Sequence, residues 1–218
     1  MTIAAYKDLC LDAGDRLVLG RFWAAVLGLD LVDRGDGVAS LRGPTPRHTV
    51  RLAEVPEART VKNRMHLDVH TGSIRELLDL GATVIEEFPR WTMMADPEGG
   101  EFCAFVREEP PAYRLYEVVL DAADHRALGR WWADLLGGRL IDEDEGFVSI
   151  ADIPGAPFEY LDVGTVPEPR TAKNRVHLDV VGDVAEIVAH GAVVLDEQPR
   201  WTVMADPEGN EFCAFPRS

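Results

Sequence analysis

An internal repeat is the feature that most constrains how this 218-residue chain can fold. Three segments recur in the same order: 19–24 at 128–133, 59–69 at 170–180, and 89–105 at 199–215. The longest pair reads PRWTMMADPEGGEFCAF in the first copy and PRWTVMADPEGNEFCAF in the second. A period of about 110 residues is too long for a solenoid unit and has the size of a whole domain. The sequence therefore predicts two tandem domains of the same fold.

The boundary between the two domains is predicted at the dipeptide Pro110-Pro111. Two adjacent prolines with charged neighbours are typical of a stiff, exposed linker. We therefore expect a first domain over residues 1–107, a linker over 108–113 and a second domain over 114–218.

Each domain shows one order of secondary structure twice. In the first domain, the pattern of apolar, capping and turn residues predicts elements over 7–13, 16–27, 29–33, 38–41, 49–55, 64–69, 73–80, 82–87, 91–94 and 101–105. Asp12 and Asp15 are both N-cap candidates for the helix over 16–27, and Gly28 can end it. The order is βαβββ, twice per domain and four times in the chain, which predicts an α+β protein.

The composition excludes several classes of partner. The chain has 22 Lys and Arg against 38 Asp and Glu, a formal net charge of -16. Such a chain repels nucleic acid and anionic membranes, because both bind through phosphates that Lys and Arg neutralise. No apolar run approaches the ~18 residues needed to span a bilayer, and the N-terminal residues lack a signal-peptide pattern. Three cysteines without a CxxC pair favour a cytoplasmic protein without disulfides.

Several predicted strands have one polar face, because strand side chains alternate between two faces. These faces carry Arg64, His66 and Asp68, with Arg175, His177 and Asp179 in the second copy; Glu101 and Cys103, with Glu211 and Cys213; and Asp8, Cys10 and Asp12, with Glu117, Val119 and Asp121. If they line one cavity per domain, its walls hold imidazole, thiol, guanidinium and carboxylate groups, which favours a small-molecule site. The alternative is a sheet with one solvated face, which needs no function.

The tryptophans and arginines have two interpretations each. Trp91 and Trp201 begin strands, and are either aromatic walls of a ligand cavity or core residues. Arg64 and Arg175 either clamp a ligand carboxylate or pair with neighbouring acids. Three tryptophans on predicted helices are expected in the core: Trp23, Trp131 and Trp132. The Asp-Pro-Glu-Gly segments at 96–99 and 206–209 are interpreted as turns without a chemical role.

These motifs resemble the vicinal oxygen chelate superfamily, which includes glyoxalase I, bleomycin-resistance proteins and extradiol dioxygenases, and within it the glyoxalase-like domain proteins. The resemblance rests on segments 19–28, 62–68 and 96–103 and on their counterparts in the second copy. It implies that each domain pairs two βαβββ modules into a cup-shaped curved sheet with helices outside. It also implies a small-molecule ligand in the cups. Because four modules in one chain can pair internally, either a monomer or a homodimer is expected.

The resemblance also implies a place for a divalent metal. Catalytic members hold the ion with four ligands, typically His and Glu or Gln, from the first and last strands of each module. The corresponding residues here are His66 and His177, Cys103 and Cys213, and Cys10 or Val119, with Glu54 and Glu159 as candidates for the fourth place. The usual set is incomplete in both copies. The candidate metal ligands are His66, Glu101 and Cys103, and Cys10 could add a second thiolate.

Three functions remain open from the sequence. The first is a cytoplasmic protein that binds a metabolite or drug-like molecule in its cups without the usual metal quartet. The second is a metal-dependent lyase, isomerase or dioxygenase of the same superfamily. The third has one domain that binds or catalyses and one that is structural. The candidate ligand-binding residues are Cys10, Arg64, His66, Trp91, Glu101, Cys103, Arg175, His177, Trp201, Glu211 and Cys213.

Overall fold

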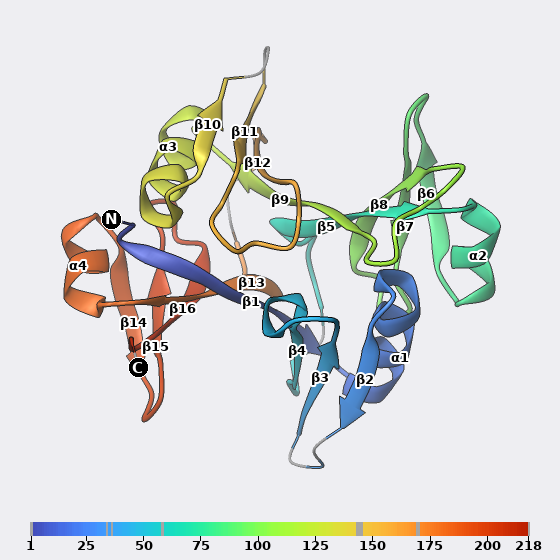
Figure 1. Ribbon diagram of the computed structural model, residues 1–218, viewed down its shortest axis with the longest axis horizontal. Helices are drawn as coiled ribbons and strands as arrows, with labels where there is room; N and C mark the ends of the chain where they lie inside the picture. The colour runs from blue at the N-terminus through green and yellow to red at the C-terminus, as the bar shows by residue number, and fades with distance from the viewer. Residues whose placement is uncertain are drawn as a thin grey trace.

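The structure is a computed structural model that describes residues 2–217 except 34, 36, 58, 143–145 and 169–170. The described residues form an α+β fold of two curved, open sheets with α-helices packed against them (Figure 1). The βαβββ order predicted four times is confirmed, with a short 3-10 helix, η1, inserted in one module.

The first repeat contains β1 (Ala4–Ala13), α1 (Arg16–Leu27), β2 (Asp30–Asp33), β3 (Val38–Arg42), η1 (Pro46–His48), β4 (Val50–Glu54), β5 (Met65–Thr71), α2 (Ile74–Asp79), β6 (Thr83–Glu87), β7 (Thr92–Ala95) and β8 (Glu101–Val106). The second repeat contains β9 (Leu115–Ala122), α3 (His125–Leu136), β10 (Arg139–Ile141), β11 (Phe147–Ala151), β12 (Tyr160–Thr165), β13 (Val176–Gly182), α4 (Val184–Ala189), β14 (Val193–Glu197), β15 (Thr202–Ala205) and β16 (Glu211–Phe215).

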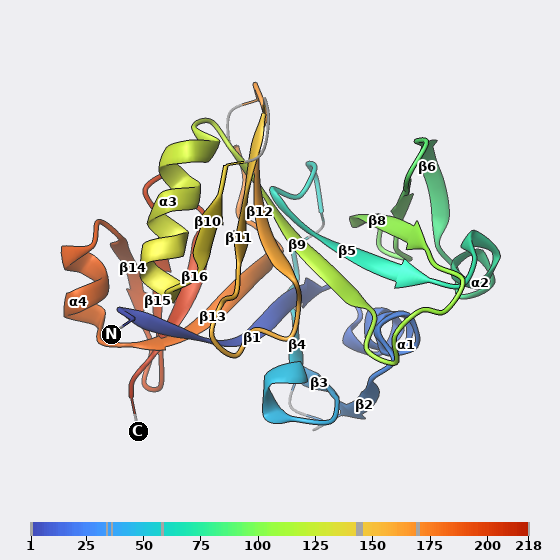
Figure 2. The ribbon, with the colours of Figure 1, turned by 45° about the horizontal axis from the view of Figure 1, so that its top comes forward.

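The modules pair across the two repeats. One sheet has the order β14-β15-β16-β13-β1-β4-β3-β2, and the other has the order β10-β11-β12-β9-β5-β8-β7-β6. The central contacts are antiparallel, β1 with β13 and β5 with β9, and Figure 2 shows both pairs running side by side. Cups of two modules were expected within each repeat, whereas each observed sheet takes one module from each repeat. We call the polar face of the first sheet cup A and that of the second sheet cup B.

The long helices begin and end as their caps dictate. Asp15, one of the two N-cap candidates, accepts hydrogen bonds from the N–H groups of Leu17 and Val18 at the start of α1. The helix ends at Gly28, whose φ of 70° lies in the left-handed region that glycine tolerates best. In the second repeat, Asp124 caps α3 in the same way.

The core lies between the apolar faces of the sheets and the helices. The ring of Trp23 on α1 contacts that of Phe102 on β8, with centroids 5.3 Å apart, although β8 belongs to the other sheet from β1–β4. Trp132 on α3 makes the corresponding contact with Phe212 on β16, also at 5.3 Å. Trp131 is buried as well. The prediction that these three tryptophans are core residues is confirmed, and each long helix joins the two sheets.

Candidate functional site

Strand register decides which predicted site residues meet. Cys10 on β1 lies opposite His177 on β13, whereas His66 on β5 lies opposite Val119 on β9. The structure therefore does not bring Cys10 to His66 and Cys103. Cys10 is in cup A with residues of the second repeat, because β1 pairs with β13 and not with β5. A site in either cup is built from both repeats.

Cup A has an imidazole between two thiols. The Nε2 atom of His177 is 3.6 Å from the sulfur of Cys213 and 3.5 Å from an oxygen of Asp179. Cys10, Asp12 and His177 also form a close group. Burial disfavours the charged imidazole, but Cys10, Asp179 and Cys213 outweigh burial and hold the pKa of His177 well above its usual value. Burial raises the pKa of Cys10.

Lys7 fills the floor of cup A. Its ammonium nitrogen is 2.8 Å from Asp8 and 3.8 Å from Asp179, and it lies 3.9 Å from the centre of the Phe215 ring. Arg51 on β4 adds a second cation, 3.0 Å from the same oxygen of Asp8. The carboxylates of this cup are thus neutralised by the protein's own side chains.

The remaining cavity of cup A lies to the side of this floor. It has a volume of about 530 Å³ and is bordered by β3, η1 and β4. Its charged lining residues are Lys7, Asp8, Arg42, Arg47 and Arg51. Trp201 faces the other half of the cup and stacks on Phe215, with ring centroids 5.9 Å apart.

Cup B has a similar centre without the lysine. The Nε2 atom of His66 is 3.3 Å from an oxygen of Asp68 and 3.9 Å from the sulfur of Cys103. Glu117 on β9 lies opposite Asp68 in the strand register and is buried. Burial raises the pKa of the Cys103 thiol, so this sulfur keeps its proton at neutral pH.

Glu117 is the most perturbed acid of cup B. Burial and the charge of Asp162 raise its pKa to about 8, and Asp68 and Glu159 add to that rise. A hydrogen bond with the Tyr116 hydroxyl acts in the opposite direction. Burial, together with the neighbouring acids, therefore favours the protonated form of Glu117 at neutral pH.

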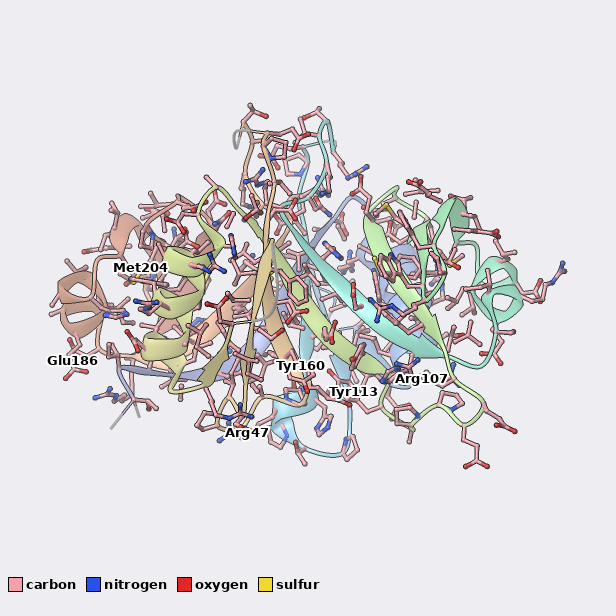
Figure 3. The ribbon with its side chains drawn as sticks, turned by 90° about the horizontal axis from the view of Figure 1, so that it is seen from above. Arg47, Arg107, Tyr113, Tyr160, Glu186 and Met204 are labelled. Atoms are coloured by element: carbon pink, nitrogen blue, oxygen red, sulfur yellow. The ribbon has the colours of Figure 1, made fainter. Side chains whose placement is uncertain are left out.

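Aromatic side chains form the walls of cup B around a cleft of about 850 Å³. The rings come from β7, β8, β9, β11 and β12 and their ends: Trp91, Phe105, Tyr116, Phe147 and Tyr160. Trp91 stacks on Phe105 with centroids 6.1 Å apart, and Tyr116 meets the edge of Phe105 at 5.3 Å. Tyr160 at the start of β12 and Arg107 after the end of β8 lie at the same end of the sheet (Figure 3), and Arg107 lies over the rings of Phe105 and Tyr116.

The predicted arginines and glutamates contact the protein itself. Arg64 donates to the carbonyl of Glu168 at 2.7 Å, and Arg175 donates to the carbonyl of Glu57 at 2.7 Å. These bonds join the loops between modules of different repeats. Glu101 pairs with Arg59, and Glu211 accepts the backbone N–H of Asn174 at 3.1 Å. Ligand binding by these four remains a prediction.

Two groups of residues were missed from the sequence. The first is Lys7 with its counterpart Tyr116, which a closer alignment of 5–13 with 114–122 shows at matching positions. The second is the buried acid of each Asp-Pro-Glu-Gly turn. Asp96 accepts the indole N–H of Trp23 at 3.2 Å, and Asp206 accepts that of Trp132 at 3.1 Å. The turns therefore anchor the long helices.

A comparison with family models identifies the family. A family model described as a glyoxalase-like domain matches residues 8–105 and 117–215. The chain belongs to the glyoxalase-like domain family. No curated protein sequence matches the chain.

Solved structures of similar fold match this glyoxalase-like protein over nearly its whole length. Glyoxalase I from Zea mays has a TM-score of 0.70 at 14% identity, covering 98% of this chain and 92% of that one. A putative dioxygenase from Bacillus subtilis has a TM-score of 0.66 at 16% identity, covering 99% and 86%. The cppA protein from Streptococcus pneumoniae has a TM-score of 0.55 at 12% identity, covering 98% and 100%. At these identities the likeness shows the fold.

The metal implied by this family can be tested against cup A. Arg51 lies beside Cys10 in the register of β1 and β4, so a guanidinium stands on the strand from which the fourth ligand is expected. Glu54, the carboxylate expected there, lies at the end of β4 and bonds Arg16. With Lys7 also at the floor, two cations oppose a divalent ion. The usual quartet of ligands does not fit cup A.

In cup B, Val119 has no donor atom at the place expected for the first-strand ligand. Asp162 lies beside Val119 in the register, whereas Glu159 precedes the strand. His66, Asp68 and Cys103 nevertheless form a group whose donor atoms lie within 4.8 Å of one another. Glu101, proposed from the sequence as the third ligand, pairs with Arg59. Within the described residues, no helix is long and apolar enough to cross a membrane.

Proposed function

We propose that this glyoxalase-like protein binds a small organic molecule with an aromatic ring in cup B. The observation that carries the proposal is a cleft of about 850 Å³ with five aromatic rings in its walls and polar groups at its floor. Ligand pockets of this size typically combine apolar, aromatic walls with a few polar groups that orient the ligand. Flat rings stack on Trp91 and Phe105, whose planes are within 28° of each other.

Cup A is assigned a structural role in this proposal. Lys7 and Arg51 already contact its carboxylates, and the cavity beside them lacks aromatic walls. The sequence left open a protein with one binding or catalytic domain and one structural domain. The division proposed here is of that kind, but it separates the two cups and not the two repeats. The protein would then hold one ligand per chain.

The test is a ligand screen followed by calorimetry. Thermal shifts would be measured with indole and naphthalene derivatives that carry a positive, a negative or no charge. We expect hits that bind with one molecule per chain, that weaken at least tenfold in Trp91→Ala and that are unchanged in Trp201→Ala. Binding that depends on Trp201 and not on Trp91 would place the site in cup A and overturn the proposal.

A second candidate function is metal-dependent chemistry in cup B, which the group of His66, Asp68 and Cys103 favours. An imidazole, a carboxylate and a thiol form a donor set that suits zinc. The test is the metal content of untagged protein purified without added metal, measured by mass spectrometry. One ion per chain that is lost in His66→Ala and kept in His177→Ala would support this candidate. Metal-free, folded protein would remove it.

A further inference from the structure

We infer that the ligand of cup B carries an ammonium group, which sits where the Lys7 ammonium sits in cup A. The inference rests on the proposed function and adds the chemical class of the ligand. It comes from a comparison inside the molecule, because cup A holds a cation in a setting that cup B repeats without one.

Cup A shows which side chains surround the ammonium group of Lys7. The Lys7 nitrogen lies between the carboxylates of Asp8 and Asp179, above the face of Phe215. Both carboxylates are buried, with exposed fractions of 4% and 3%. Buried charges are tolerated when they are paired, and an aromatic face adds further attraction for a cation. The site is therefore built for an ammonium group.

Cup B keeps each partner of that ammonium. The strand registers place Glu117 at the position of Asp8, and Asp68 at the position of Asp179. Phe105 lies two residues after Cys103 in the sequence, as Phe215 lies two residues after Cys213. Glu117 and Asp68 are also buried, with exposed fractions of 9% and 5%.

Cup B lacks both cations of cup A. Tyr116 stands at the position of Lys7, at the same irregularity of the strand register. Asp162 stands at the position of Arg51, beside Val119 as Arg51 is beside Cys10. One exchange removes a positive charge, and the other replaces a positive charge with a negative one. The floor thus differs from that of cup A by three charge units in the acidic direction.

Among the described residues, neither Asp68 nor Glu117 has a Lys or Arg within ion-pair distance. The ion-pair partner of Asp68 among them is His66, at 3.3 Å, and it is charged only when protonated. Glu117 has no cationic group within ion-pair distance among those residues. Two arginines line the cleft farther out, Arg90 over the Trp91 ring and Arg107 over the Phe105 and Tyr116 rings. A ligand amine would complete the floor.

The ligand that fits is an arylalkyl amine. Its ammonium group would contact Glu117 and Asp68 at the floor, and its ring would extend along the aromatic walls toward Trp91. A carboxylate in the same place would meet three acids and bind poorly. A neutral ligand would gain the ring contacts alone.

The test compares three probes with one ring system: tryptamine as the cation, tryptophol as the neutral form and indole-3-propionate as the anion. Calorimetry at neutral pH is expected to show at least tenfold tighter binding of tryptamine than of tryptophol, and the weakest binding for the anion. Glu117→Gln is expected to weaken tryptamine at least fivefold and to leave tryptophol within twofold. Asp8→Asn, the matched change in cup A, should alter neither. Circular dichroism would verify that both variants are folded.

The outcomes separate this inference from the proposed function. Equal binding of the three probes, with loss in Trp91→Ala, would overturn the ammonium assignment and leave the aromatic site in place. Tighter binding of indole-3-propionate than of tryptamine would also overturn the ammonium assignment and leave the aromatic site in place. Failure of all three probes to bind the wild-type protein would overturn both.

Discussion

Cup A and cup B share a scaffold and differ in the charge of their floors. Each has a His, a Cys and a pair of buried acids at matching positions of its sheet. In cup A, Lys7 and Arg51 neutralise the acids. In cup B, Tyr116 and Asp162 take those two positions. This difference indicates that the side chains at two positions determine whether the buried acids of a cup are paired within the protein or are available to a ligand.

The largest expected effect comes from removing the cation of cup A. Lys7→Met leaves Asp8 and Asp179 buried with one partner fewer, which is expected to lower the free energy of unfolding by about 3 kcal/mol. Urea denaturation of the variant and the wild-type protein measures it. Tyr116→Phe in cup B removes no charge and is the control, with a loss below about 1 kcal/mol. A Lys7→Met protein as stable as the wild type would refute the role given to Lys7.

A matched pair of core changes tests whether the scaffolds are equivalent. Trp23→Phe and Trp132→Phe each remove an indole N–H that bonds a buried acid, at 3.2 Å to Asp96 and 3.1 Å to Asp206. Each is expected to cost about 2 kcal/mol, from the lost hydrogen bond and the smaller ring. Thermal or urea denaturation would show two similar losses. Clearly different losses of stability in the two variants would show that the cups differ in their scaffold as well as in the charge of their floors.

Transplanting the lysine tests the comparison directly. Tyr116→Lys supplies cup B with the ammonium group that cup A contains. We expect the variant to lose binding of tryptamine by at least tenfold, or about 1.4 kcal/mol. Calorimetry with tryptamine measures the loss, and Trp201→Ala, a change in cup A, is the control. Unchanged affinity in Tyr116→Lys would show that the two cups do not hold cations in the same place.

The last expected effect is a dependence of stability on pH. The pKa of Glu117 is raised to about 8, so its protonated form favours the folded state. Its contribution is complete below the unfolded value of about 4.3 and is lost as pH rises through about 8. Thermal midpoints from pH 5 to pH 9 should therefore fall more steeply in the wild type than in Glu117→Gln. Parallel curves for the two proteins would contradict this assignment.

The sequence predicts the local part of this fold well. The repeat, the four βαβββ modules and the helix caps depend on residues close together in the chain, and the structure confirms them. The alternation of strand side chains also places His66 with Cys103 and His177 with Cys213 correctly. These features follow from patterns with a period of two residues or of one helical turn.

Such patterns do not predict which modules pair with each other. All four modules have similar strand edges, so hydrophobic alternation does not say which first strand pairs with which. Cys10 was therefore grouped with His66, whereas its neighbour is His177. The acidity of cup B was missed for the same reason, because Glu117 and Asp68 belong to different repeats and meet only through the contact of β5 with β9.

The exchange of modules also sets an order for folding during synthesis. The strands of cup B are contained in residues 65–165, whereas cup A joins β1–β4 to β13–β16 from the opposite end of the sequence. Pairing of β1 with β13 closes a loop of more than 160 residues, and such distant contacts form slowly. We expect cup B to be assembled on the ribosome while the first module still exposes the edge of β1. Until β13 emerges, that edge is a place where a chaperone or a second chain can bind.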